Sequence, residues 1–167
     1  MREYASSVVD ILSHFPSLAH FVQGFDAVQA LQILRFADGE IEVELGTSIR
    51  GKTIFLFTSC ARNGAGIPND EAKLELYHAV DALKRAQPKR IVVFEPYVSS
   101  SRSDRTTRRN SVGLWVHFKT LASLGASHII TFQLHSDKSK IMLDPLSCAI
   151  DDIPALPLLK RHICDRY

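Results

Sequence analysis

At 167 residues, the chain has the length of a single domain with room for a hydrophobic core. Hydrophobic residues make up 46% and charged residues 23%, which is typical of an ordinary soluble globular protein. The formal net charge of +2 excludes a molecule that binds polyanions over its whole surface, so any anion site must be local.

The cysteines and the absence of long apolar runs indicate the cellular compartment of the protein. Cys60, Cys148 and Cys164 are odd in number, widely separated and without metal-ligand spacing, which favours reduced thiols in a cytoplasmic protein. No apolar run reaches the roughly 18 residues of a membrane span. The first residues do not resemble a signal peptide. We therefore expect one cytoplasmic domain over residues 1–167, with no membrane contact.

The first elements along the chain are a helix and two strands. Apolar residues at helical spacing over residues 8–15 predict a helix that Pro16 ends. Residues 30–36 read as a strand. Residues 41–45 alternate with period two, which predicts a half-exposed strand.

The strongest pattern is a buried strand followed by a helix. The continuous apolar run from Thr53 to Ser59 predicts a strand that is covered on both faces. Residues 69–87 predict a helix with Asn69 as its N-cap. Its dipole favours the acids in the first turn and the bases in the last turn, and its inner face is apolar. The acids are Asp70 and Glu71, and the bases are Lys84 and Arg85. The apolar residues of the inner face are Leu76, Val80 and Leu83.

The pattern then repeats. Residues 90–96 predict a second buried strand, and residues 111–125 predict a helix capped by Ser111 and closed by Gly125. The apolar face of that helix consists of Leu114, Phe118 and Leu121. Further on, a third buried strand is predicted at residues 128–134, a compatible strand at 148–152 and a helix begun by proline at 154–167.

Buried strands that alternate with helices predict an α/β fold. We expect a three-layer α/β/α domain with a mainly parallel sheet, helices on both faces and right-handed crossovers. Ligands of such sheets bind outside the carboxyl ends of the strands. That rule points to the long polar loops at residues 60–70, 96–111 and 134–145.

The three loops carry different chemistry. The glycines of the first loop match neither a Walker motif nor a dinucleotide motif, which favours a flexible turn. The second loop contains Arg102, Arg105, Arg108 and Arg109, whose guanidinium groups could clamp phosphate beside the next helix N-terminus. The alternative is a solvated charged loop. In the third loop, His135 near Asp137 and Asp144 could hold a divalent metal, although a lone histidine is more often structural.

Three collinear segments carry a resemblance to a known family. The stretches RFADGEIEVELGTSIRGKTIFLFTS, PNDEAKLELYHAVDALKRAQPKRIVVFEPY and GASHIITFQLHSDK resemble the N-terminal half of ribose-phosphate pyrophosphokinases, from about Leu34 to Pro145. The combination of FxDGE, SxRGK, PY…RxDR and LH motifs is specific. The resemblance implies a phosphoribosyltransferase-like fold and the ATP-side half of an enzyme.

The resemblance also implies roles for single residues. ATP binding falls on Phe36, Asp38, Gly39 and Glu40, which would reach the adenine site of a neighbouring subunit, and on Arg102 and Ser103. His135 would contact the Mg²⁺ that accompanies ATP. Ser48 and Arg50 are similar to part of a regulatory phosphate site that some members have.

The sequence departs from the family pattern at several points. Ser103 stands where family members usually have Gln, and Gln133 stands where an acid commonly precedes the LH pair. The loop after Tyr97 is expected to be about two residues longer than is usual in the family, which leaves the pairing of Arg102 open. No short strand is predicted before the first helix.

The implied activity is Mg²⁺-dependent transfer of diphosphate from ATP to ribose 5-phosphate by a homo-oligomer with shared active sites. The family's second domain, with its ribose-phosphate loop and catalytic lysine, is not expected in this chain, so the chain alone should be catalytically incomplete. One alternative is a non-catalytic subunit that joins and restrains the synthase. Nucleic-acid binding by the arginines is disfavoured, because no aromatic residue follows Tyr97 in the loop.

Overall fold

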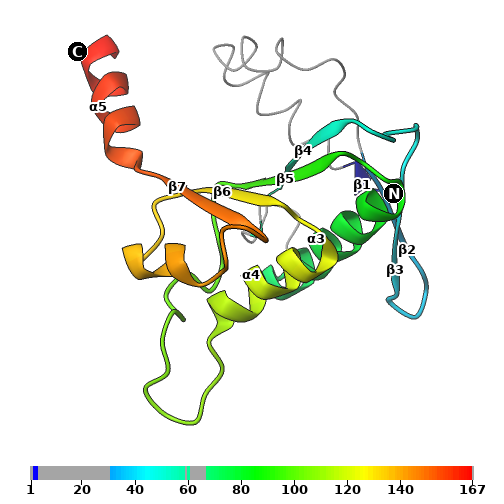
Figure 1. Cartoon of the computed structure of the whole chain (residues 1–167), viewed down its shortest axis with the longest axis horizontal. Coiled ribbons are helices and arrows are strands. Elements are labelled where there is room, and N and C mark those ends of the chain that lie inside the picture. The colour runs from blue at the N-terminus through cyan, green and yellow to red at the C-terminus, as the bar shows by residue number, and fades with distance from the viewer. Residues whose placement is uncertain (1, 4–30, 59, 61–66, 167) are drawn as a thin grey trace.

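A four-stranded parallel sheet forms the centre of the domain (Figure 1). The computed structural model describes residues 2–3, 31–58, 60 and 67–166. Within them, the strands are β4 (Thr53–Phe57), β5 (Arg90–Glu95), β6 (His128–Phe132) and β7 (Ala149–Ile153), in the order β4-β5-β6-β7. All three pairings are parallel. The predicted α/β class and mainly parallel sheet are confirmed.

The edge strand β4 corrects one prediction. The sequence predicted that β4 would be covered on both faces, but Leu56 is its only buried residue and Phe55 is 42% exposed. Among the described strands, β4 has a neighbour on one side only, whereas β5 lies between two strands and is buried along most of its length. An apolar run therefore indicated the strand correctly but not its position in the sheet.

Two helices cover one face of this sheet. α3 (Asn69–Arg85) joins β4 to β5, and α4 (Gly113–Leu124) joins β5 to β6. Both crossovers step in the same direction across the sheet, so right-handed connections place both helices on the same side. Figure 1 shows them side by side below the strands. The predicted inner stripes are confirmed as core by Leu76, Val80, Leu83, Leu114, Phe118 and Leu121.

Both predicted N-caps are wrong. α3 is preceded by Pro68 and has no side-chain cap, so Asn69 is its first helical residue. α4 begins at Gly113, and Ser111 makes no capping bond. Instead, Ser103 comes from ten residues earlier: its Oγ accepts from the Gly113 N–H at 2.9 Å. Its carbonyl oxygen accepts from the Leu114 N–H at 3.1 Å.

The other helix-end predictions are confirmed. Asp70 and Glu71 lie in the first turn of α3, and Lys84 and Arg85 lie in its last turn. Gly125 ends α4 in the left-handed conformation, at φ 110°.

A second, antiparallel sheet contains β1 (Arg2–Glu3), β2 (Gln32–Arg35) and β3 (Ile41–Glu44). The expectation that no short strand opens the chain is therefore wrong, because β1 pairs with β2. The alternating burial of β3 confirms the half-exposed strand. Arg35 forms ion pairs with Glu71 and Glu75, which attach the end of β2 to α3. The helix predicted at residues 8–15 lies outside the described residues.

The last part of the chain contains the 3₁₀ helix η2 (Asp137–Ile141) and α5 (Ala155–Arg166). As predicted, the last helix begins directly after Pro154. α5 has no buried residue and extends away from the sheet (Figure 1). The Gln133 side-chain oxygen accepts from the Ala155 N–H at 3.2 Å and so caps this helix. No helix of the described residues is long and apolar enough to cross a membrane.

Replacement of Gly125 by Ala should destabilise the domain by roughly 1–2 kcal/mol, because an L-residue is strained in the left-handed region. In addition, the new Cβ would approach the Lys84 side chain to 2.7 Å. Urea unfolding would measure the change. Gly46→Ala is the control, because its Cβ would meet nothing within 4 Å and its φ lies outside the left-handed region. Equal stability of the two variants would contradict this account.

Candidate functional site

The arginine-rich loop leaves the carboxyl end of β5 through two tight turns. The Ser101 N–H donates to the Val98 carbonyl at 3.3 Å, and the Ser103 N–H donates to the Ser100 carbonyl at 2.8 Å. Ser100 has a φ of 70°, which is uncommon for a residue other than glycine. The start of the loop therefore has a defined conformation that is fixed by its own backbone bonds.

The loop presents exposed cations beside the start of α4. Arg102, Arg105, Arg108 and Arg109 are all exposed, and in the part of the chain that the structure describes none of them forms an ion pair within 4.0 Å. Figure 1 shows the loop extending from the domain just before α4. Guanidinium groups next to a helix N-terminus suit an anion such as phosphate.

His135 lies at the same edge of the sheet. Its backbone N–H donates to the Ser101 Oγ at 2.8 Å, so the loop after β6 is joined to the loop after β5. The residue itself is exposed. The structure thus brings the segment of Arg102 and Ser103 next to His135, as the carboxyl-edge rule predicted.

The two carboxylates near His135 do not complete a metal site. Asp137 is paired with Lys140 at 2.8 Å, and the hydrogen bond and charge of Lys140 lower the pKa of Asp137. Asp144 accepts from the Leu146 N–H at 2.9 Å. Among the described residues, no three His, Cys, Asp or Glu side chains lie together in a way that could hold a metal. Within the described residues, His135 could therefore supply at most one ligand to a metal ion.

The other predicted residues lie elsewhere in the chain. Residues 36–40 form the exposed turn of the β2–β3 hairpin, where Phe36 is 49% exposed and Gly39 has a φ of 93°. Asp38 accepts from the Glu40 N–H at 3.1 Å within the turn. Ser48 and Arg50 are exposed between β3 and β4. The hairpin and the arginine-rich loop are well separated in Figure 1, so one chain does not bring them together.

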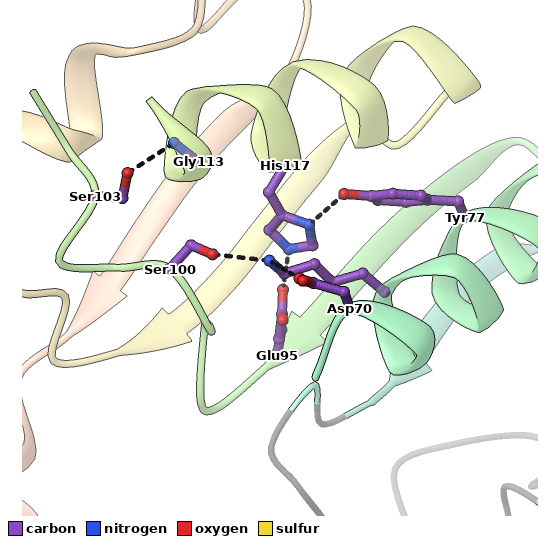
Figure 2. Close-up of polar contacts among 8 residues, drawn as sticks. Asp70, Tyr77, Glu95, Ser100, Ser103, Gly113 and His117 are labelled. Carbon is purple, nitrogen blue, oxygen red and sulfur yellow. Dashed lines mark hydrogen bonds and ion pairs between the residues drawn. The ribbon is translucent and has the colours of Figure 1, made fainter. Parts of the chain in front are cut away.

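A buried polar chain beneath the site was missed by the sequence analysis. The Tyr77 hydroxyl lies 2.9 Å from His117 Nδ1, and His117 Nε2 lies 2.7 Å from Glu95 Oε2 (Figure 2). Glu95 is 0% exposed and His117 is 1% exposed. The chain links α3, α4 and the last residue of β5. Burial, followed by the nearby negative charges, raises the pKa of Tyr77 to about 12.

Two further polar groups adjoin this chain. Cys60 is fully buried, and burial, the charge of Glu95 and a hydrogen bond to it raise the pKa of the Cys60 thiol far above its ordinary value. The ammonium group of Lys73 donates to the Ser100 Oγ at 2.8 Å and to the Asp70 Oδ1 at 3.0 Å. All three cysteines are free, as predicted.

A signal for this cluster exists in the sequence. Lys73 precedes Leu76 by three residues, and His117 follows Leu114 by three residues, so both stand in the apolar stripes of their helices. Glu95 ends β5 directly after four apolar residues. A polar residue at a position that the periodicity assigns to the core needs a buried partner, and that rule would have singled out all three.

The described residues thus define an α/β domain that presents a cationic loop at the carboxyl edge of a parallel sheet. Residues 8–125 match the family described as the N-terminal domain of ribose phosphate pyrophosphokinase. The chain therefore belongs to the ribose-phosphate pyrophosphokinase family.

Individual relatives agree with this family. The ribose-phosphate pyrophosphokinase of Nitrosomonas europaea is 32% identical over 152 residues, which cover 89% of this chain and 46% of the relative. The Burkholderia pseudomallei protein of the same name is 38% identical over 130 residues, or 76% of this chain and 38% of the relative. The chain thus spans less than half of the length of these two relatives.

A solved structure gives the same fold. The crystal structure of phosphoribosylpyrophosphate synthetase from Mycobacterium smegmatis matches with a TM-score of 0.75 at 29% identity. The match covers 91% of this chain and 49% of that chain.

The free energy of unfolding should fall as the pH rises above about 9, the ordinary thiol pKa. Above that value the unfolded chain loses the Cys60 proton while the folded chain keeps it, which costs up to about 1.4 kcal/mol per pH unit. Urea unfolding at pH 8, 9 and 10 under reducing conditions would measure the slope. Cys60→Ala should reduce the slope, with the remainder coming from buried Cys148, whose pKa burial raises to about 11. Cys164→Ala, at an exposed cysteine, should leave the slope unchanged. A slope that Cys60→Ala leaves unchanged would contradict the assignment.

Proposed function

We propose that this chain is the ATP-binding half of a ribose-phosphate diphosphokinase. The observation that carries the proposal is the Ser101–His135 hydrogen bond, because it joins the two loops that the family resemblance associates with ATP and its Mg²⁺. The four exposed arginines and the adjoining α4 N-terminus supply the positive potential that a triphosphate requires.

In this proposal each residue has a separate task. Arg102, with Ser103 beside it, holds the phosphates. His135 contacts the Mg²⁺ that enters as part of the substrate MgATP. Phe36 stacks on adenine, and the carboxylates of Asp38 and Glu40 accept hydrogen bonds from its amino group. Gly39 lies between these two acids in the turn. The hairpin lies apart from the loop within one chain, which supports an oligomer in which a neighbouring subunit supplies the adenine pocket.

The proposed reaction is a diphosphoryl transfer. The anomeric hydroxyl of ribose 5-phosphate attacks the β-phosphorus of ATP, the bond between that phosphorus and the α-phosphate oxygen breaks, and AMP leaves. Such a transfer depends on positioning and on neutralising phosphate charge, which are the contributions that Arg102 and the loop would make. The ribose 5-phosphate site and the catalytic residues would come from outside the matched half. Ser48 and Arg50 remain proposed contacts for a regulatory phosphate.

A second candidate is a non-catalytic subunit that joins the synthase and restrains it. Two residues that depart from the family pattern have structural tasks here, which favours this candidate. Ser103 accepts two backbone N–H groups at the start of α4. Gln133 caps α5. Under this candidate the protein would join the oligomer without turning over ATP.

Arg102→Ala should weaken MgATP binding about tenfold or more, because a charge-assisted bond to phosphate contributes roughly 1.5–3 kcal/mol. Calorimetry on the assembled protein would measure this. Arg85→Ala is the control, because Arg85 is an exposed arginine at the other end of α3 and pairs only with Asp81 at 2.7 Å among the described residues.

Two outcomes would separate the alternatives. Unchanged binding by a folded, oligomeric Arg102→Ala protein would refute the assigned role. A fall in AMP formation when this protein is added to an active ribose-phosphate pyrophosphokinase would favour the non-catalytic subunit.

A further inference from the structure

Lys73 is a buried cation within the first two turns of α3. Its side chain is 10% exposed, whereas that of its ion-pair partner Asp70 is 92% exposed. The same ammonium group reaches 27 residues along the chain to the Ser100 Oγ, at 2.8 Å. A buried charge is retained only where partners satisfy it, so this contact fixes Lys73 and Ser100 together.

Ser100 is the residue of the loop with the least usual backbone. Its φ of 70° lies in the left-handed region, which a serine adopts only when its surroundings enforce it. The bond from Lys73 ties this side chain from one side. On the other side, Gly113 lies so close that a Cβ added there would be 3.2 Å from the Ser100 Cβ. Figure 2 shows Ser100 between Asp70 and the Ser103–Gly113 contact.

The consequence extends to the residues that face solvent. Ser100 accepts from the Ser103 N–H through its carbonyl, and Ser103 in turn caps α4. Ser101, which follows Ser100, accepts from the His135 N–H. Arg102 lies between Ser101 and Ser103, which are both held by these hydrogen bonds. The direction of its side chain therefore depends on the backbone that Lys73 holds.

We propose that Lys73 is a positioning residue, which acts through Ser100 to fix the loop that presents Arg102 to the phosphates of ATP. The assignment rests on the proposed function for its ligand, but its structural part is independent. Lys73 needs no contact with the nucleotide, because its donors are directed to Asp70 and Ser100. Its removal should loosen the loop first and weaken nucleotide binding as a result.

The structural part is tested by hydrogen–deuterium exchange without ligand. Lys73→Met keeps the length of the side chain but removes its charge and donors. The amides of residues 97–104 should then exchange roughly tenfold faster, as expected for the loss of a charge-assisted hydrogen bond. Ser100→Ala should act in the same way. Lys160→Met, on exposed α5, is the matched control and should leave this exchange unchanged.

The functional part is tested by the MgATP affinity of the assembled protein, measured by calorimetry. Lys73→Met and Ser100→Ala should each raise the Kd for MgATP about tenfold. The double variant should be no worse than either single variant, because both remove one interaction. Lys73→Arg should restore part of the affinity, since it keeps a donor and the charge.

The outcomes distinguish the two proposals. Unchanged exchange in folded Lys73→Met and Ser100→Ala proteins would overturn the positioning role. Faster exchange, together with no ATP binding by the unmodified protein, would refute the proposed function and not the link to the loop. If Lys73→Met fails to fold, Ser100→Gly decides: it removes the acceptor while tolerating the φ, and normal loop protection there would refute the role of the bond.

Discussion

The parallel pairing of β5 with β4 and β6 is the constraint on which the site depends. In that register Glu95 lies opposite Thr131, so the loops that leave β5 and β6 start side by side. With this alignment, Ser101 lies close enough to accept from the His135 N–H. The same pairing sends α3 and α4 across one face, where their apolar stripes meet over β5. Core and site thus follow from one arrangement of strands.

Beneath that edge, the interior contains a group of buried polar side chains. Glu95, His117 and Tyr77 link β5, α4 and α3, and Lys73 links α3 to the loop. Burial of such groups costs desolvation energy, so their net contribution to stability is small. Hydrogen bonds have a direction that apolar contacts lack. The network therefore fixes how the helices and the loop sit relative to one another, which is what a phosphate site requires.

The elements were predictable because their periodicities are strong. The stripe of Leu76, Val80 and Leu83 and the apolar run of β5 each indicated one structure, and both are confirmed. The capping groups of α3 and α4 were not predictable from local signals. Ser111 was the obvious cap for α4, yet Ser103 satisfies its N–H groups from ten residues away. The exposure of Phe55 was missed for a related reason, since composition does not show which strand lies at an edge.

The sequence by itself determined the α/β class, the cationic loop at the carboxyl end of a strand and the family, because these depend on local pattern and on motifs. Tertiary structure alone decided which side chains meet. It placed the His135 N–H against Ser101 and the Lys73 ammonium group against Ser100, each within hydrogen-bond distance. It also separated the hairpin that carries Phe36 from the loop that carries Arg102. The two contacts connect residues that are 34 and 27 positions apart. Pairings of that kind are set by strand register and helix packing, which no local pattern encodes.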